Sequence, residues 1–221
     1  LTIENLPDLN ETITVPEDIF EELTAQDASV AGFNPYEQPT VRDLLYGVLL
    51  PSGADACETL ARAVGGSEEG FVAMMNQKAE ELGLTNTHFE NCTGLHNDNH
   101  YSTCRDIAVL MSECLKSDTF REIVTREVYT TEATASHPEG ITLYDTMLHR
   151  FTSYEMSTTL ENGAVIEGGK TGFTDEAGQC LVSFAEYGGE EYILVTAEAM
   201  TDSGSAVDSI ADASTVYGRL Q

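Results

Sequence analysis

The last third of the chain, from Val165 onwards, leaves helical patterning and predicts consecutive strands joined by short turns. Strand-like segments cover residues 179–186 and 191–199, and residues 187–190, which include Gly188 and Gly189, form the turn between them. Strands joined by so short a turn pair antiparallel, because a parallel pair needs a longer crossover. The chain is therefore predicted to end in an antiparallel sheet, closed by a helix from Ser203 to Leu220.

The residues before this sheet are predicted to be mainly helical. An apolar run follows Thr40, a suitable helix N-cap, and helical patterning resumes at residues 54–64 after a break. A third helix begins at Ser67 and ends at Gly83. Helices followed by an antiparallel sheet predict an α+β fold, and 221 residues suit one globular domain. Further predictions are a strand at 12–15, a loop at 85–101, and helices at 103–115 and 118–124.

The chain is strongly acidic, with 38 Asp and Glu residues against 10 Lys and Arg residues and a formal net charge of −28. Such a surface repels nucleic-acid phosphates and anionic lipids, so we exclude both as partners. The acidic residues are spread along the sequence rather than run together, and we attribute them to solubility. No apolar stretch approaches the roughly 20 residues that a membrane-spanning helix needs.

Metal or thiol chemistry finds little support in the sequence. The five cysteines form no C-x-x-C pair, and their odd number argues against a complete disulfide framework. His96, Asp98 and His100 could ligate a metal, but nothing nearby completes the set and the segment is rich in turn residues. Cys57 could act as a nucleophile, but no histidine lies near it in sequence. We therefore predict no metal and no cofactor.

The sharpest chemical signal is Lys170-Thr171-Gly172, preceded by Gly168-Gly169 and followed by Phe173-Thr174 at the start of the predicted sheet. A lysine flanked by glycines on an edge strand lets a substrate backbone lie close to an ammonium and a hydroxyl group. This arrangement suits a substrate that ends in a free carboxylate. The tripeptide alone is a weak signal, since chance matches are common.

The second signal is Ser52, which lies in a short break between two predicted helices, within Pro51-Ser52-Gly53-Ala54. A serine at such a break can point its hydroxyl group into a cleft. It can equally cap the helix that follows. The local sequence leaves both interpretations open.

Together these segments resemble the active-site serine penicillin-recognising enzymes, specifically the low-molecular-mass D-alanyl-D-alanine carboxypeptidases. The resemblance covers about residues 12 to 200, with the signatures in the family's order. It implies a serine β-lactamase/transpeptidase-like α+β fold, in which helices flank an antiparallel sheet and a subdomain is all-helical. The segments that carry it are Leu49–Ala56, Gly66–Phe71, Leu82–Phe89, Gly94-Leu95, His100–Thr103, Arg105-Asp106 and Gly168–Gly178.

The resemblance implies a serine-type carboxypeptidase that removes the terminal D-Ala from peptidoglycan stem peptides through an acyl-enzyme and is acylated by β-lactam antibiotics. Ser52 would be the serine of the family's S-x-N motif, relaying a proton toward the leaving amine. Lys170 would supply positive potential, and Thr171 would contact the substrate carboxylate beside Gly172. The backbone N–H of Phe173 would be one of two oxyanion-hole donors. No cofactor or metal is implied.

Two departures from the family pattern bear on activity. Ala54 stands where the S-x-N motif has asparagine, and we consider the hypothesis that Asp55 partly substitutes for that side chain. The nucleophile motif S-x-x-K is missing, since none of the three lysines follows a serine by three positions. The family places this motif just upstream of the segment that Leu1–Leu6 resembles. We therefore expect residues 1–221 to be a single catalytic domain, incomplete at its N-terminus and inactive alone.

The resemblance also implies a bacterial, extracytoplasmic protein, in the cell envelope or secreted, with membrane association only through regions outside this chain. Two alternatives stay open. A non-catalytic relative that binds cell-wall peptide is favoured by Ala54 and by the missing S-x-x-K. A β-lactamase is disfavoured by the order of the signatures and by the lack of an evident deacylating glutamate.

Overall fold

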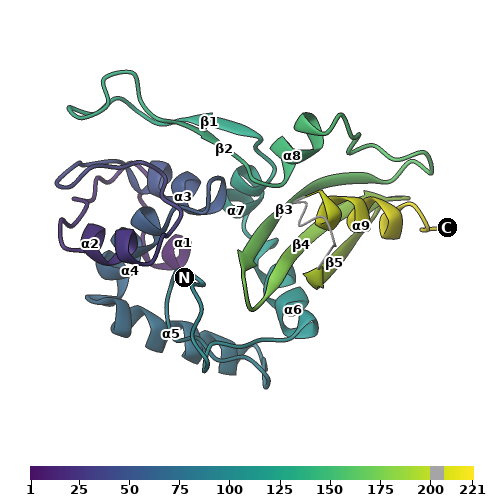
Figure 1. Cartoon of the computed structure of the whole chain (residues 1–221), viewed down its shortest axis with the longest axis horizontal. Helices are drawn as coiled ribbons and strands as arrows, with labels where there is room; N and C mark the ends of the chain where they lie inside the picture. Colours follow the sequence, from purple (N-terminus) through teal and green to yellow (C-terminus); the bar gives the residue numbers. More distant parts are fainter. Residues whose placement is uncertain (200–206) are drawn as a thin grey trace. The chain divides into compact units, whose positions relative to one another are not determined.

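The structure, a computed structural model, describes residues 1–199 and 207–221, and the chain divides into two compact units (Figure 1). The first unit comprises residues 1–101 and 128–145, and the second comprises residues 102–127 and 146–221. The first unit contains α1 (Thr2–Asn5), α2 (Ile19–Ala25), α3 (Val41–Leu49), α4 (Ala54–Gly65), α5 (Glu68–Glu81), β1 (Val128–Thr130) and β2 (Thr142–Tyr144).

The predicted helices of the first unit begin at side-chain caps that are visible in the sequence. The Thr40 hydroxyl accepts a hydrogen bond from the Asp43 N–H at 3.1 Å, and the Asp43 carboxylate accepts one from the Thr40 N–H at 3.2 Å. Ser67 caps α5 by accepting from the Gly70 N–H at 3.1 Å. Gly66 ends α4 in the left-handed conformation, at φ +76°. These boundaries confirm the predicted positions of α3, α4 and α5.

The two-stranded sheet of β1 and β2 packs against α3 through the ring of Tyr129 and the carboxylate of Asp43. The ring of Tyr129 stacks on that of Tyr46, with 3.6 Å between centroids and 5° between planes. The Tyr129 hydroxyl and the Glu132 N–H both donate to Asp43 Oδ1, at 2.9 and 3.1 Å. Asp43 is fully buried, so these bonds replace the water that its carboxylate loses.

The second unit contains α6 (Cys104–Cys114), α7 (Asp118–Val124), α8 (Leu148–Ser153), β3 (Val165–Thr174), β4 (Gly178–Tyr187), β5 (Glu190–Ala199) and α9 (Asp208–Tyr217). Its strands form an antiparallel sheet in the order β3-β4-β5, with Lys170 opposite Val182 and Val182 opposite Val195. The predicted antiparallel sheet is therefore confirmed. The predicted start of the last helix at Ser203 lies outside the described residues.

Helices cover both faces of this sheet (Figure 1). Alternate residues of β4 pack with different helices. Leu181 and Ala185 pack with α8 and α9, and Ser183 bonds the hydroxyl of Tyr217 on α9 at 3.1 Å. Phe184, on the opposite face, packs with α6 and α7. A strand covered on both faces explains why β4 is apolar along most of its length.

The predicted strand at 12–15 reduces to one β-bridge, between Thr12 and Thr40. All five cysteines are free thiols. Each helix in the described part of the chain is too short or too polar to cross a lipid bilayer.

Candidate functional site

Ser52 lies in a tight turn between α3 and α4 and has a left-handed backbone, with φ +62°. The turn is held by the Gly53 N–H, which donates to Gly47 O at 2.9 Å, and by the Ala54 N–H, which donates to Ser29 O at 2.8 Å. The N-cap of α4 is Gly53, and no side chain caps this helix. The interpretation of Ser52 as a helix cap is therefore wrong.

Asp55 does not take the place of the missing asparagine side chain. Its carboxylate is fully buried and accepts hydrogen bonds from the backbone N–H groups of Ala31, Gly32, Phe33 and Ala56, at 2.7 to 3.0 Å. A carboxylate with two oxygens shared among four backbone donors has no room for a substrate group. The hypothesis of a substitute substrate contact is wrong for this residue.

The predicted residues of the second unit lie at consecutive positions on β3. The Lys170 ammonium is half-buried and donates to Thr171 O at 2.8 Å. Thr171 is buried, and its hydroxyl shares a hydrogen bond with that of Thr146 at 2.6 Å. Gly172 and Phe173 are exposed, the latter by 60%. The strand therefore passes from a buried stretch to an open one across the predicted binding motif.

The glycines of this motif differ in the space around them. A Cβ on Gly169 would lie 2.4 Å from Val182 O and 2.8 Å from Met147 Sδ, whereas a Cβ on Gly172 would meet nothing closer than 3.8 Å. The missing side chain at Gly169 therefore allows β3 to approach β4 and Met147 closely, and Gly172 leaves the surface of β3 open at its own position.

Replacing Gly169 by alanine should therefore destabilise the protein by about 1–3 kcal/mol, the usual cost of overpacking. The G172A protein should unfold at the wild-type denaturant concentration, because the added methyl group meets only ordinary contacts. Urea unfolding of both variants followed by circular dichroism checks the pair. Equal loss of stability in the two variants would contradict this explanation.

Ser52 belongs to the first unit, and Lys170, Thr171, Gly172 and Phe173 belong to the second. The first unit thus holds a strained serine turn, and the second holds the open end of a lysine-bearing strand. The assignment of these residues to one active site stays a prediction.

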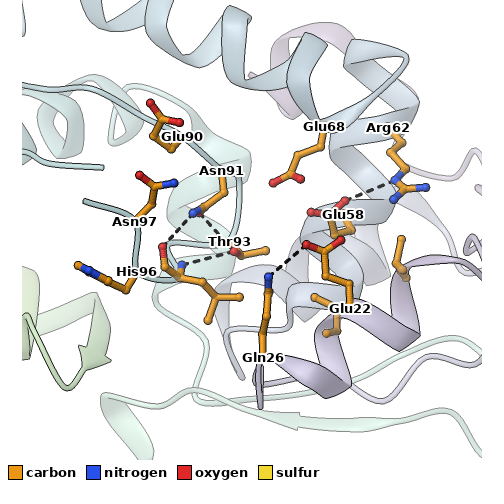
Figure 2. A pocket seen from close by; sticks show the side chains of 13 residues that line it. Glu22, Gln26, Glu58, Arg62, Glu68, Glu90, Asn91, Thr93, His96 and Asn97 are labelled. Carbon is orange, nitrogen blue, oxygen red and sulfur yellow. Dashed lines mark hydrogen bonds and ion pairs between the residues drawn. The ribbon is translucent and has the colours of Figure 1, made fainter. Parts of the chain in front are cut away.

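A cavity of about 220 Å³ in the first unit is lined mainly by polar side chains of α2, α4, α5 and the loop 90–97 (Figure 2). Glu58 and Glu68 line it, and Cys92 completes a group whose ligand atoms all lie within 4.8 Å of one another. The Cys92 thiol donates to Glu58 Oε1 at 3.3 Å, and Arg62 Nε lies 3.4 Å from Glu58 Oε2. The donor set of one thiol and two carboxylates could hold a divalent metal.

This cluster escapes prediction from the sequence because its members are separated by ten and 24 residues and match no metal-binding spacing. The metal site considered at His96 differs from this cluster in exposure. His96 Nε2 lies 3.3 Å from Asp98 Oδ1, and both side chains are well exposed. The only signal that could have pointed to the cluster is the pair of acidic residues Glu58 and Glu68, which lie on consecutive predicted helices.

Burial and the neighbouring Glu68 carboxylate raise the pKa of Glu58 above its ordinary value of 4.5. A folded state that holds the proton more tightly loses stability as the pH rises through the raised pKa. Glutamine at position 58 does not titrate, so the E58Q protein lacks this loss of stability with rising pH. Its stability should therefore rise relative to that of wild type as the pH increases from 4.5 to 7.5. Melting temperatures of both proteins across that range measure the difference.

Glu69, one residue beyond Glu68 and exposed, provides a control with a different pH window. Hydrogen bonds from its own backbone N–H and from Ser67 lower its pKa from the ordinary 4.5, so the stability that its charged form contributes is lost only as the pH falls below about 4.5. The difference in stability between E69Q and wild type should therefore stay nearly constant from pH 4.5 to 7.5. A constant difference between E58Q and wild type from pH 4.5 to 7.5 would contradict the raised pKa of Glu58.

A second cavity, of about 690 Å³, lies in the second unit between α8 and the start of β3. Its lining includes Leu148, Phe151 and Ile166, with Glu127 and Glu167 among its polar residues. Among the described residues, the lining of neither cavity includes Ser52 or Lys170.

Comparison with known proteins gives one consistent result. Residues 4–201 match the family model described as D-alanyl-D-alanine carboxypeptidase. The chain is 36% identical over 168 residues to the D-alanyl-D-alanine carboxypeptidase DacF of Bacillus subtilis, a match covering 76% of this chain and 40% of that protein. It is 35% identical over 191 residues to the D-alanyl-D-alanine carboxypeptidase of Streptomyces sp. strain K15, covering 84% of this chain and 63% of that protein. The chain thus spans between two fifths and two thirds of the length of these relatives.

The fold agrees with solved structures of similar proteins. The crystal structure of the Streptomyces K15 DD-transpeptidase matches with a TM-score of 0.78 and 32% identity, covering 96% of this chain and 79% of that one. A D-alanyl-D-alanine carboxypeptidase from Mycobacterium tuberculosis matches with a TM-score of 0.77 and 26% identity, covering 98% of this chain and 75% of that one. The predicted transpeptidase-like α+β fold is confirmed.

Proposed function

We propose that this chain, which belongs to the D-alanyl-D-alanine carboxypeptidase family, forms part of a serine-type enzyme that removes the terminal D-Ala from peptidoglycan stem peptides. The enzyme would act outside the bacterial cytoplasm, where peptidoglycan lies, and β-lactam antibiotics would acylate it. The observation that most supports the proposal is the segment Gly168–Phe173 on β3, which places a lysine and a threonine before an exposed stretch of strand.

The proposed chemistry is acyl transfer in two steps. A serine Oγ attacks the carbonyl carbon of the D-Ala-D-Ala peptide bond, an ester bond forms, and the amide C–N bond breaks as the leaving amine takes a proton. Water then hydrolyses the ester. The family's nucleophile belongs to its S-x-x-K motif, which the present sequence does not contain.

The residues of this chain would supply the remaining functions. Ser52 would pass the proton to the leaving amine, and the Lys170 ammonium would hold positive potential near Ser52 and the substrate carboxylate. Thr171 would contact that carboxylate. A carboxylate only accepts hydrogen bonds, so Thr171 would donate its one proton to it and accept from the Thr146 hydroxyl, since either of these two threonines can be the donor in the bond between them. Gly172 would let the peptide approach, and the Phe173 N–H would stabilise the oxyanion.

The test is the intact mass of two forms of the protein before and after incubation with benzylpenicillin. The natural full-length gene product should gain the mass of one penicillin. The 221-residue chain of 24.0 kDa should gain nothing, because it has no S-x-x-K serine. No mass gain in either form would overturn the proposed activity.

A non-catalytic protein that binds cell-wall peptide is the second candidate. Two observations favour it: Ala54 replaces the S-x-N asparagine, and the Asp55 carboxylate is fully engaged by backbone groups. Calorimetric binding of a peptide ending in D-Ala-D-Ala to the full-length protein, without mass gain from benzylpenicillin, would decide for this candidate.

A further inference from the structure

The buried Asp55 carboxylate ties a distant segment to the start of α4. Its Oδ1 accepts from the N–H groups of Ala31 at 2.7 Å and Ala56 at 3.0 Å. Its Oδ2 accepts from Gly32 and Phe33, both at 3.0 Å. Three successive N–H groups of one segment therefore converge on one side chain. Charge-assisted bonds of this kind are stronger than bonds between neutral groups.

The segment held by Asp55 forms one wall of the Ser52 turn. Ser29 O, two residues before the clamped stretch, accepts from the Ala54 N–H at 2.8 Å. A Cβ on Gly53 would lie 2.7 Å from both the N and the Cβ atoms of Ala31. The two backbones therefore touch, and movement of residues 29–33 would change the space around the turn.

The Ser52 turn needs such support because its backbone is strained. A residue other than glycine in the left-handed region loses roughly 1–2 kcal/mol relative to its ordinary conformations. Such residues persist only where the surroundings over-determine them. Of the two backbone bonds that hold this turn, the one from Ala54 ends on the segment that Asp55 fixes.

We propose that Asp55 is a positioning residue for Ser52, acting through the backbone of residues 29–33. The inference rests on the proposed role of Ser52 in acyl transfer. The carboxylate holds the segment, the segment holds the turn, and the turn sets the direction of the Ser52 hydroxyl. Asparagine would fit the same space, but its NH₂ group would face a backbone N–H that has lost its acceptor.

Asp43 provides a matched comparison in the same unit. It is also fully buried, and it also accepts from two backbone N–H groups, those of Thr40 and Glu132. It lies in the first turn of α3, about two helical turns before the chain reaches Ser52. The D43N variant should lose stability comparably without disturbing the Ser52 turn.

The experiment compares wild type, D55N and D43N in the natural full-length protein. Acylation by benzylpenicillin gives the limiting rate constant, the apparent dissociation constant and the fraction of molecules acylated. Hydrogen exchange followed by NMR gives the protection of the Gly53 and Ala54 amides. Loss of stability alone lowers the acylated fraction, whereas misplacement of Ser52 lowers the rate constant of the molecules that remain folded.

For D55N we expect a limiting rate constant about tenfold to a hundredfold lower, with the apparent dissociation constant changed less than about threefold. The Gly53 and Ala54 amides should exchange at least about tenfold faster in D55N and within about twofold of wild type in D43N. If wild type is acylated and D55N reacts as fast as D43N, the positioning role is overturned. If wild type is not acylated, the proposed function fails, and unchanged exchange at Gly53 and Ala54 in D55N would separately overturn the positioning role.

Discussion

Replacing Lys170 by alanine is expected to slow acylation of the full-length protein by benzylpenicillin by about a hundredfold to a thousandfold, as loss of a preorganised electrostatic group does. Lys170 is the only cationic residue of β3, and its half-buried ammonium is tied to Thr171 O at 2.8 Å. A positive charge held in place stabilises a developing negative charge without having to reorganise. Stopped-flow acylation kinetics of the K170A variant measure the effect.

Lys116 offers the control for this variant. It lies in the same unit, is 69% exposed in its side chain and forms a surface ion pair with Glu113. The K116A variant should acylate at the wild-type rate, because an exposed ion pair contributes little. A decrease of less than about tenfold in K170A, or an equal decrease in both variants, would contradict the role proposed for Lys170.

Replacing Phe184 by alanine should lower the free energy of unfolding by about 3–5 kcal/mol, a larger loss than we expect for G169A. Its ring is fully buried at the centre of β4 and packs with Met111, Leu115 and Val124. The missing ring leaves a cavity that α6, α7 and the sheet cannot fill by moving together. The melting temperature, measured by calorimetry, should fall on the order of 10 °C.

Phe173, on the neighbouring strand, is the matched control because it has the same side chain in an exposed position. It is 60% exposed, so F173A removes little buried surface and should change stability by less than about 0.5 kcal/mol. The variant also keeps the backbone N–H on which the proposed oxyanion role depends. A loss in F173A equal to that in F184A would show that the burial of Phe184 contributes little.

The sequence was sufficient to locate α3, α5 and the hairpin of β4 and β5, because their signals are local. Thr40 and Ser67 bond to amides three residues ahead of them, and Gly188-Gly189 gives a tight turn between strands. Several short elements escaped prediction, although α7, which also has seven residues, was predicted at 118–124. The helix α2 lacks a side-chain cap of the kind that Ser117 gives α7. The strand β1 has three residues, paired with residues 12 to 16 positions away, and so few residues show no clear hydrophobic period.

The residues of the candidate site also differ in how much the sequence reveals about them. The residues Ser52, Lys170 and Thr171 stood out in the sequence because glycines and a helix break mark positions where a backbone can be approached closely. Asp55 carried the wrong hypothesis because an aspartate beside a motif looks available to a substrate. Its four donors include residues 22 to 24 positions away, and only the folded backbone brings them to one carboxylate.

The sequence by itself determined the order of the longer elements, the antiparallel sheet and the family, since all three depend on neighbours within a few residues or on motifs in a fixed order. Only the tertiary structure decided which polar groups are buried and what they bind. It turned Asp55 into a backbone clamp, gathered Glu58, Glu68 and Cys92 into one cluster, and gave Ser52 its left-handed turn. These outcomes depend on contacts between segments far apart in the chain, and no local propensity encodes them.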